Sequence, residues 1–415
     1  MASINLSKKT DLARLRKITL DRQGLFRDAT FGKGKPAALR AIEHIGYVQI
    51  DTISVVERAH NHVWRSRVPN FTAVMVDRLL GEGSIFEYWA HAASFLPMCD
   101  YRFSLPTKQR YITGEARWVR SRDTKLIGEV LGRIRSEGPL RSRDLDDPNT
   151  KRRGWWDWKP AKRAVEQLYM QGDLMISSRE GFQKSYNLTE RVLPDNVDTS
   201  MPSVDELATH LFQQALRCHG LVTLKGIAYA RRRCPQLRQA AKTLVEDHLD
   251  EGLLDTIQIP SGQAFYAEPG LLDRAPRAAA TIRFLSPFDN AVIQRDRLDA
   301  LFQFDYQIEC YVPEANRKFG YFSLPILFHD LFIGRMDCKA HRKTRVLEIR
   351  QLHFEDGIVI SDEVIDAFVA ALPRFMEFQD CDEVVLSQVN PSSARQALAG
   401  AIRAGDSQAA IAAGT

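Results

Sequence analysis

An internal repeat constrains the fold of this 415-residue chain more than any other feature. One copy begins at Gly138-Pro139-Leu140 and runs through a helix-compatible stretch to Gly172-Asp173-Leu174. The other begins at Gly220-Leu221-Val222 and reaches Gly252-Leu253-Leu254, so the matching glycines are 82 and 80 residues apart. Each copy then continues into two strand-like segments joined by a turn that contains glycine. A helix that ends on glycine and is followed by a hairpin is typical of a winged helix-turn-helix.

A third, weaker copy lies near the N-terminus. Residues 36–42 have helical periodicity, and we match the join Ile45-Gly46-Tyr47-Val48 to the join at Gly172. Three winged-helix units in tandem are therefore expected at roughly 5–70, 120–195 and 203–272. Chance spacing of helices that share the common glycine cap remains the alternative.

The sequence changes character from about residue 280. Short apolar or alternating runs rich in Phe, Tyr, Ile and Val follow one another, which indicates an antiparallel sheet or a small barrel. Residues 362–377 form an amphipathic helical pattern, and the small, polar last fifteen residues are expected to fray. The expected class is α+β, with domains at 1–115 (first winged-helix unit with a catalytic strand and helical extension), 116–198, 199–275 and 276–390 (barrel-like), and a flexible tail at 391–415.

Charge is distributed unevenly along the chain. The first 200 residues carry 34 Lys and Arg against 24 Asp and Glu, whereas the remaining 215 carry 23 against 28. A polyanionic partner would therefore sit mainly on the N-terminal half, although a solvated basic surface has the same composition. The six cysteines form no C-x-x-C pair, and no apolar run approaches the ~18–20 residues that span a bilayer. We expect a cytoplasmic, nucleoid-associated monomer with no membrane contact.

The segment GYVQIDTISVVERAH contains the first candidate for chemistry. If Tyr47–Thr52 is a strand, alternation directs Val48 and Ile50 to the core, and Gln49 and Asp51 to the opposite face. An amide can orient a water molecule, and a carboxylate can accept its proton or stabilise a neighbouring cation. The pair could activate water, but an ordinary solvated strand face has the same pattern.

Interleaved cationic and aromatic residues follow this segment. A nucleic-acid surface would use them as contacts, and the alternative is that the histidines and Trp64 lie in the core. His60 and His62 have strand-face spacing for a metal, but no third ligand has a recognisable spacing, so we predict no metal site. The candidate DNA contacts in this segment are Arg58, His60, His62, Arg65 and Arg67.

A second basic and aromatic segment precedes the expected recognition helix of the second unit. All six tryptophans lie within the first 158 residues, and KRRGWWDWK leads into this helix. The helix would present Lys159, Lys162 and Arg163 to phosphates, and the wing would present Arg179, Lys184 and Tyr186. Winged helices also dock proteins, so this surface alone does not establish DNA binding.

Several motifs together resemble the AlkZ/YcaQ-type DNA glycosylases, a winged-helix family that unhooks interstrand crosslinks. They are GYVQIDTISVVERAH, FEYWAHAASFLPM, RGWWDWKPAKRA, REGFQKSYNLTERVLP and SPFDN…R, in the same order over about residues 35–390. The resemblance implies tandem winged helices with a C-terminal barrel-like domain, and catalytic roles for Gln49 and Asp51. The third motif position is Asp rather than Gln, which resembles the broader-acting repair subgroup.

The resemblance implies a monofunctional, cofactor-free glycosylase acting on double-stranded DNA with alkylated or crosslinked purines, of the 7-alkylguanine type. No lyase activity is expected, because no lysine stands in the motif. Two alternatives stay open, a non-catalytic winged-helix transcription regulator and a protein-interaction scaffold. By the same resemblance, further DNA contacts are assigned to Trp89, His91, Arg283, Asp289 and Arg295.

Overall fold

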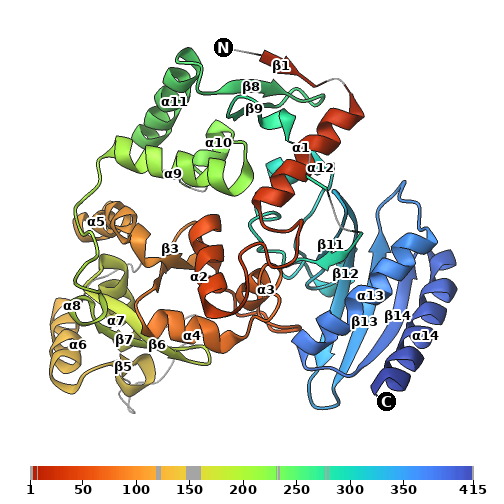
Figure 1. Ribbon diagram of the computed structural model, residues 1–415. Helices are drawn as coiled ribbons and strands as arrows, with labels where there is room; N and C mark the ends of the chain where they lie inside the picture. The colour runs from red at the N-terminus through yellow and green to blue at the C-terminus, as the bar shows by residue number, and fades with distance from the viewer. Residues whose placement is uncertain are drawn as a thin grey trace.

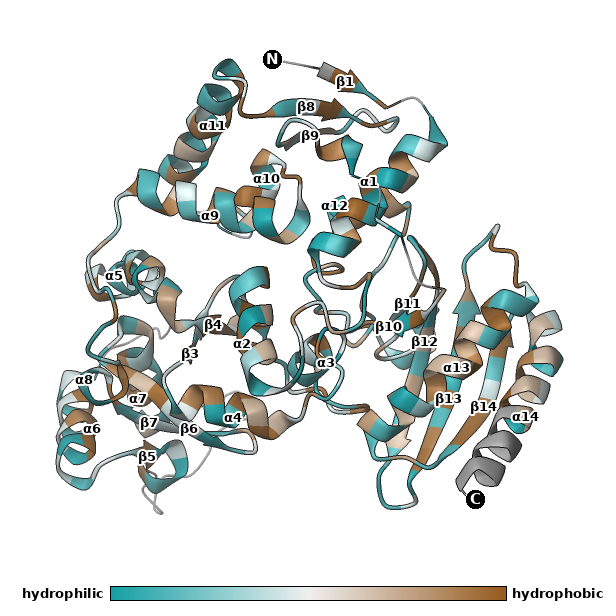
Figure 2. Ribbon diagram, viewed as in Figure 1, coloured by the Kyte–Doolittle hydropathy of each residue, from teal (hydrophilic) through white to brown (hydrophobic). Residues whose placement is uncertain are grey.

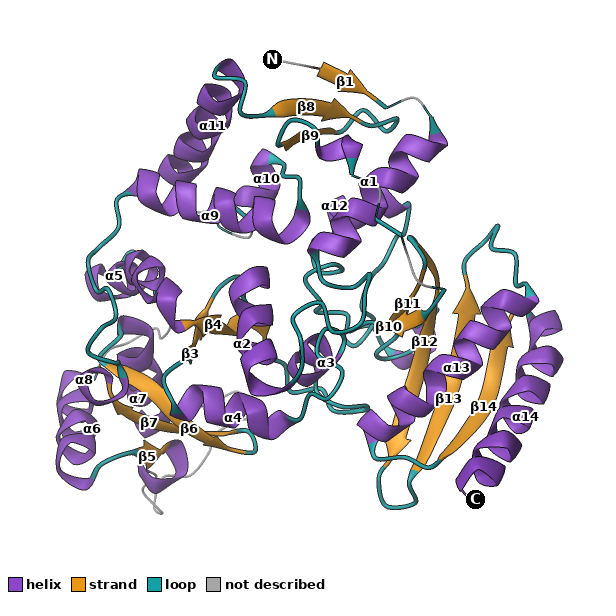
Figure 3. Cartoon of the chain, viewed as in Figure 1, coloured by secondary structure: helices purple, strands orange, loops and turns teal. Residues whose placement is uncertain are grey.

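The described residues of the chain form a mixed α+β structure with four sheets (Figures 1 and 3). The computed structural model describes residues 3–6, 8–117, 123–145, 160–229, 231, 234–274, 276–277 and 280–413, with only the backbone for 405–413. Three sheets have three strands each and one has five, which confirms the α+β class. Within these residues, no helix is long and apolar enough to cross a membrane.

The segment at 124–192 has the order of elements that the repeat predicts. Its first strand pairs with the last one, giving the sheet order β5-β7-β6. Gly172 follows α7 with a φ of 91°, a left-handed conformation that a residue with a side chain rarely adopts. The elements are α6 (Thr124–Glu137), β5 (Leu140–Arg141), α7 (Pro160–Gln171), β6 (Leu174–Glu180), β7 (Gln183–Leu188) and α8 (Thr189–Val192).

The segment at 204–267 repeats this order and adds the N-terminus of the chain. Helix α9 begins with a capping box in which Ser203 and Glu206 satisfy each other's backbone N–H groups. Strand β1 pairs in parallel with β8, and α1 packs on α9. Residues 5–22 were predicted to belong to the first repeat copy, and this prediction is wrong, because they pack against the copy at 204–267. The elements are β1 (Ser3–Asn5), α1 (Lys9–Arg22), α9 (Val204–His219), α10 (Leu224–Ile227), α11 (Pro235–Asp250), β8 (Asp255–Gln258) and β9 (Ala264–Ala267).

The remaining copy lies at 34–97, and its predicted alignment is wrong. Gly46 follows the first helix of the copy with a φ of 85°, as Gly138 and Gly220 do in theirs. Gly83 is the counterpart of Gly172, because it lies between the last helix and the hairpin. The elements are α2 (Gly34–Ile45), β2 (Val48–Gln49), α3 (Ala59–Arg65), α4 (Ala73–Gly81), β3 (Ile85–Trp89) and β4 (Ala93–Pro97), followed by a 3-10 helix, η1 (Met98–Ser104), and α5 (Leu105–Thr113).

The C-terminal part is one open sheet with strand order β10-β11-β12-β13-β14. Its edge strands β10 and β14 do not pair with each other among the described residues, so the sheet does not close into the predicted barrel. Helix α13 connects β13 to β14, and these two strands are parallel. Figure 2 shows hydrophobic residues along the strands of this sheet. The elements are β10 (Ile282–Phe284), α12 (Arg295–Phe302), β11 (Leu324–Phe328), β12 (Leu331–His341), β13 (Val346–Phe354), α13 (Asp362–Gln379), β14 (Glu383–Asn390) and α14 (Arg395–Ala413).

The segment after β14 is helical and packed, so the predicted tail at 391–415 is wrong over its described part. Ala394, Leu398 and Ile402 are buried in the core of the five-stranded sheet. Ala394 ends the 3-10 helix that precedes α14, and the spacing of four residues places Leu398 and Ile402 on one face of α14, which contacts both α13 and β14. Small residues dominate this segment, but these three positions supply an apolar stripe sufficient for docking.

Candidate functional site

Strand β2 places the residues of the candidate catalytic pair. Val48 lies opposite Phe95, and Gln49 opposite Ser94, at the edge of the sheet β2-β4-β3. Val48 and Ile50 are buried, as the alternation predicts. The opposite face is less open than expected, because Gln49 is only 8% exposed.

Gln49 is held by the turn of the neighbouring hairpin. Strands β3 and β4 meet at Ala90–Ala92, and His91 in this turn lies with its Nε2 2.7 Å from Oε1 of Gln49. Burial lowers the pKa of His91 to about 4, with Arg231 adding to the effect, so the imidazole is neutral at pH 7. A neutral ring that carries its proton on Nε2 donates to the amide oxygen, which fixes the Gln49 side chain in one orientation.

Asp51 is half-buried just beyond the strand. Its Oδ1 accepts a hydrogen bond from the backbone N–H of Ile53 at 2.8 Å. Burial raises the pKa of Asp51, and backbone hydrogen bonds from Ile53 and Thr52 oppose part of that rise. Its charge is also felt by Cys310 and by Tyr311, whose side chain is 89% exposed. The carboxylate of Asp51 is therefore partly desolvated, and its charge raises the pKa of the exposed Tyr311.

The loop after Asp51 is fixed by another part of the chain. The backbone N–H of Ala340 donates to the carbonyl of Val55 at 2.8 Å. Arg342 donates to the carbonyls of Ser54 at 3.1 Å and Val56 at 3.0 Å. The hairpin β12–β13 thus braces the loop that follows Asp51.

The turn that carries His91 also borders a small cavity of about 80 Å³. First-copy residues Tyr47, Trp89 and His91 line one side, and Tyr229 and Arg231 line the other. The His91 ring lies 5.0 Å from that of Tyr47 and 5.3 Å from that of Tyr229. Trp89 and His91, both assigned to DNA contact, therefore line this cavity, and His91 contacts Gln49 directly.

The two histidines of the candidate nucleic-acid surface lie inside the protein. They are on helix α3 rather than on a strand, so their spacing of two residues points them to different faces. His60 packs edge-on against Phe95, and Nε2 of His62 donates to the carbonyl of Phe284 at 2.8 Å. Burial lowers their pKa values to about 3 and about 4. Neither is available to DNA, and the described residues hold no cluster of three metal-binding side chains.

Arg67 and Asp289 form a fully buried ion pair rather than DNA contacts. Two nitrogens of the guanidinium meet the two carboxylate oxygens at 2.7 and 2.9 Å, and both side chains are 0% exposed. Arg67 also donates to the carbonyl of Gln23 at 2.8 Å. This pair joins α3 to the start of the C-terminal part, so its role is structural.

Other arginines assigned to DNA are engaged within the protein. Arg65 pairs with Glu377 at 2.6 Å, and Arg283 pairs with Asp28 at 2.9 Å. Arg295 donates to the carbonyls of Val292 and Pro287 at 2.7 and 3.1 Å. The guanidinium of Arg58 lies 4.0 Å from the ring centroid of Phe182 and is partly exposed. Of these four arginines, Arg58 is the one next to the candidate catalytic loop.

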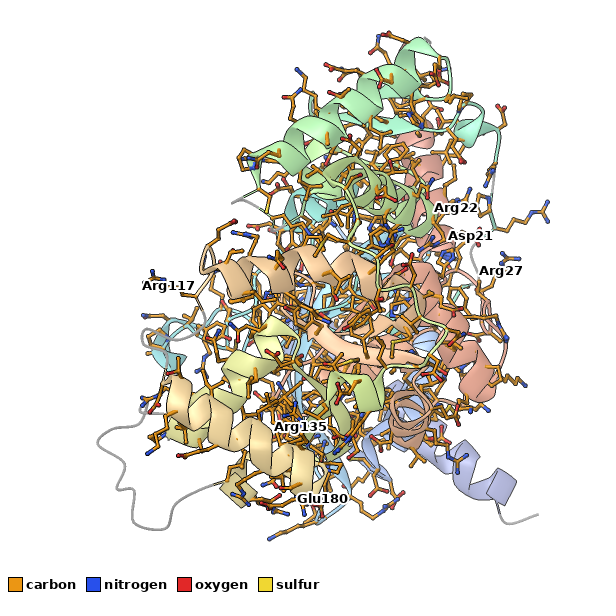
Figure 4. The ribbon with its side chains drawn as sticks, turned by 90° about the vertical axis from the view of Figure 1, so that its left-hand side faces the viewer. Asp21, Arg22, Arg27, Arg117, Arg135 and Glu180 are labelled. Carbon is orange, nitrogen blue, oxygen red and sulfur yellow. The ribbon has the colours of Figure 1, made fainter. Side chains whose placement is uncertain are left out.

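The hairpin β6–β7 points its cations inward, contrary to the wing prediction. Arg179 meets both oxygens of Glu87 at 2.7 and 2.8 Å, and Lys184 lies 3.1 Å from the same carboxylate. Glu87 is fully buried, and Tyr186 is buried with its hydroxyl bonded to Glu166 at 3.0 Å. By contrast, Glu180 faces outward and is labelled at the lower edge of the molecule in Figure 4.

The approach to α7 is partly described. Lys162 and Arg163 lie in the first turns of this helix and are half-exposed, so their DNA contacts remain a prediction. Lys159 and the tryptophans of KRRGWWDWK lie outside the described residues.

Sequence reasoning missed two residues that shape this region. Glu87 stands in the apolar strand IFEYW, and a carboxylate in a buried strand is itself a signal that cations lie opposite. Arg231 lines the cavity, and burial lowers its pKa. No local signal identifies Arg231, because its neighbours come from a segment about 140–180 residues away in sequence.

Comparison with known proteins agrees with this architecture. A family model described as "DNA glycosylase AlkZ-like" matches residues 42–378. Among solved structures, the Streptomyces sahachiroi DNA glycosylase AlkZ is similar, with a TM-score of 0.60 and 15% sequence identity. That match covers 93% of this chain and 100% of the other. At this identity the likeness shows a shared fold.

Proposed function

Because the chain belongs to the AlkZ-like DNA glycosylase family, we propose that it hydrolyses the N-glycosidic bond of cationic alkylated purines in double-stranded DNA. The substrates are of the 7-alkylguanine type and include interstrand crosslinks. The observation that carries the proposal is Gln49, oriented by His91 and two residues from the half-buried Asp51. The proposed reaction uses no metal or cofactor.

The chemistry of the lesion suits this small set of groups. A purine alkylated at the seven position is already cationic, so the electron pair of the breaking C–N bond neutralises it without a general acid. The sugar then becomes oxocarbenium-like, as in glycoside hydrolysis. A fixed carboxylate stabilises that cation, and each ~1.4 kcal/mol of differential stabilisation gives roughly tenfold in rate.

Gln49 and Asp51 have complementary roles in this proposal. With Oε1 engaged by His91, the amide of Gln49 is held in place, and its NH₂ group can bind the attacking water. The water oxygen bonds to the anomeric carbon, and a water proton passes to Asp51. Oδ1 of Asp51 accepts a hydrogen bond from the backbone N–H of Ile53, which anchors the side chain. A carboxylate has further lone pairs, and these would accept the water proton and face the sugar. His91 is a positioning residue.

The rest of the chain would bind the duplex. We propose that the three helix–hairpin copies are winged helices, with Lys162 and Arg163 contacting phosphates near the start of α7. The exposed ring of Tyr311 and the partly exposed Arg58 lie near the candidate loop and fit a DNA-facing surface. The absence of a lysine in the QID motif supports a monofunctional enzyme without lyase activity. We also propose that the protein acts as a nucleoid-associated monomer.

A second candidate function is a non-catalytic DNA-binding regulator. The observation that favours it is the low exposure of Gln49, which is 8%. The two functions differ in whether a base is released.

The test uses a duplex with one 7-methylguanine and a second duplex with a nitrogen-mustard crosslink. Wild-type protein should release the base and leave an intact abasic site, and Gln49→Ala should reduce the single-turnover rate by about 10²-fold. Salt-sensitive DNA binding without base release would favour the non-catalytic regulator. No DNA binding at all would contradict both functions and favour the protein-interaction scaffold. Cleavage of the abasic strand by pure protein would contradict the monofunctional assignment.

A further inference from the structure

One aromatic side chain of the C-terminal part stands almost wholly in water. Tyr311 is 89% exposed, the highest value among the large hydrophobic side chains of the described residues. A buried aromatic ring removes roughly 150–250 Å² of surface from water, and Tyr311 forgoes nearly all of that stabilisation. Single exposed apolar side chains are common, so the surroundings of this ring decide whether it has a use.

Tyr311 lies at the tip of a rigid turn in the segment between α12 and β11. The backbone N–H of Val312 donates to the carbonyl of Glu309 at 2.9 Å, which closes the turn around Tyr311. The side chain of Glu309 is buried, and its carboxylate accepts from the backbone N–H groups of Lys318 at 3.0 Å and Phe319 at 2.7 Å. These bonds fix the backbone that carries the ring before any partner arrives, which lowers the entropy cost of a contact.

A buried arginine ties the same segment to the five-stranded sheet. The guanidinium of Arg335, on β12, lies 4.0 Å from the ring centroid of Phe319 and 4.6 Å from that of Phe304. Arg335 also donates to the carbonyl of Asp305 at 2.9 Å and to the carboxylate of Glu355 at 2.8 Å. The segment is therefore held to the sheet on both sides of the tip, while the tip itself stays in water.

The tip belongs to the neighbourhood of Asp51. Ile308, three residues before Tyr311, and Ile53, two residues after Asp51, pack against the same hydrophobic core. The pKa of Tyr311 is raised by the adjacent Cys310, by partial burial and by the negative charge of Asp51. Charges that water can reach act on one another over roughly 10 Å, so the exposed ring and the candidate catalytic carboxylate border the same patch of surface.

We propose that the ring of Tyr311 stacks on the alkylated purine and selects it for its positive charge. The inference rests on the proposed function, which makes a cationic purine the substrate. The face of an aromatic ring attracts a cation, and stacking needs no hydrogen bonds, so one ring can serve cationic purines with different alkyl groups. The attraction is lost as the leaving purine becomes neutral. It therefore strengthens substrate binding and does not speed cleavage of the bond.

The test measures binding, on two duplexes that differ in the charge of one base. One contains 7-methylguanine and the other its neutral analogue 7-methyl-7-deazaguanine, both on 2′-fluoro sugars that resist hydrolysis. By fluorescence anisotropy, wild-type protein should bind the cationic duplex about tenfold more tightly. Tyr311→Leu should reduce this preference at least about threefold, whereas Tyr311→Phe, which keeps the ring, should retain it. On ordinary 7-methylguanine DNA, Tyr311→Leu should raise the KM and leave the saturating single-turnover rate within about twofold.

Val359→Ala is the matched control, because this side chain is 79% exposed on the loop between β13 and α13, and it should leave both affinities unchanged. No charge preference in the wild type, an unchanged preference in Tyr311→Leu, or equal weakening of both duplexes would overturn the inference. Base release by a wild type whose preference is independent of Tyr311 would leave the proposed function standing and this inference wrong. A preference that depends on Tyr311 without base release would support stacking and contradict the glycosylase function.

Discussion

Hairpins β3–β4 and β6–β7 occupy equivalent positions in two copies of the same unit, yet they serve different purposes. The turn of β3–β4 carries His91 to Gln49 and borders a cavity. The strands of β6–β7 turn Arg179 and Lys184 inward to Glu87, which itself lies on β3. One hairpin presents a polar group to the candidate site, and the other holds the two copies together.

This difference teaches that a basic hairpin is not by itself a DNA-binding wing. In strand β6, consecutive residues face opposite sides, so Arg179 is buried while Glu180 is exposed. The buried carboxylate of Glu87 decides which side the cations face. Burial alone would raise the pKa of Glu87, but Lys184 and Arg179 outweigh burial and lower it.

The largest effect is expected at the candidate site beside β3–β4. Asp51→Asn should slow base release by about 10³-fold, because the cation-stabilising charge and the base are both lost. Since burial raises the pKa of Asp51, its ionised form costs stability at neutral pH, and the variant should be slightly more stable. Single-turnover kinetics and urea unfolding measure the two effects. A variant that is less stable and equally active would refute the assignment.

For the inward-facing cations of β6–β7, Glu87→Gln on β3 should cost about 3–5 kcal/mol of unfolding free energy, because Arg179 and Lys184 lose their buried partner. The matched control is Glu180→Gln, an exposed partner of Arg141 and Arg143, which should cost less than about 1 kcal/mol. The contribution of Glu87 is present above its ordinary pKa of 4.5 and is lost as pH falls through its lowered pKa. The unfolding free energies are measured by urea denaturation. Equal losses for the two variants would contradict the role of Glu87 in holding the two copies together.

The rate of base release should also depend on acidity. Catalysis needs the carboxylate of Asp51, so the rate should fall about tenfold per pH unit below its raised pKa. The acid limb should therefore lie above the ordinary aspartate value of 3.8. A rate profile measured above the pH at which the protein unfolds checks this, and a limb at or below 3.8 would exclude Asp51 as the base.

His91 allows a smaller test of the β3–β4 turn. His91→Phe should slow base release about tenfold, because Gln49 loses the donor that orients it, while the pH profile keeps its shape. His91→Asn, which can still donate, should recover part of the rate. A changed acid limb in His91→Phe would mean that the imidazole exchanges protons and does not merely position Gln49.

The smallest effect is expected for the predicted wing. Lys184→Gln should change DNA affinity less than about twofold, with an unchanged salt dependence, because this lysine faces Glu87. Arg163→Gln, in the first turns of α7, is the comparison and should weaken binding by roughly tenfold at low salt. Fluorescence anisotropy against salt concentration distinguishes them, and the reverse order would restore the wing as the DNA contact.

Local sequence was sufficient for the elements and insufficient for their partners. The order of helix, glycine and hairpin at Gly172 and Gly252 depends on residues that are consecutive in the sequence, so it could be predicted. Gly46 was aligned to the wrong glycine, because the two-residue strand β2 leaves almost no periodicity. An open sheet and a barrel have the same strand pattern, since only long-range pairing separates them.

The candidate site shows the same limit. Gln49 and Asp51 stand out through motif resemblance, whereas the orienting contact from His91 bridges 42 positions. Three of the arginines assigned to DNA, Arg65, Arg67 and Arg283, meet carboxylates more than 200 residues away. Charge in a sequence predicts a need for opposite charge, and a folded chain can satisfy that need internally.

The pairing of β1 with β8 has a consequence for the order in which the protein can be completed. Ser3 is opposite Thr256, so β1 finds its partner only after some 250 more residues have been made. At about 5–20 residues per second, this wait lasts roughly 12–50 seconds. The copies at 34–97 and 124–192 can fold during that time, whereas β1 can pair only once β8 has been made. A newly made chain would thus carry β1 without its partner strand throughout that interval.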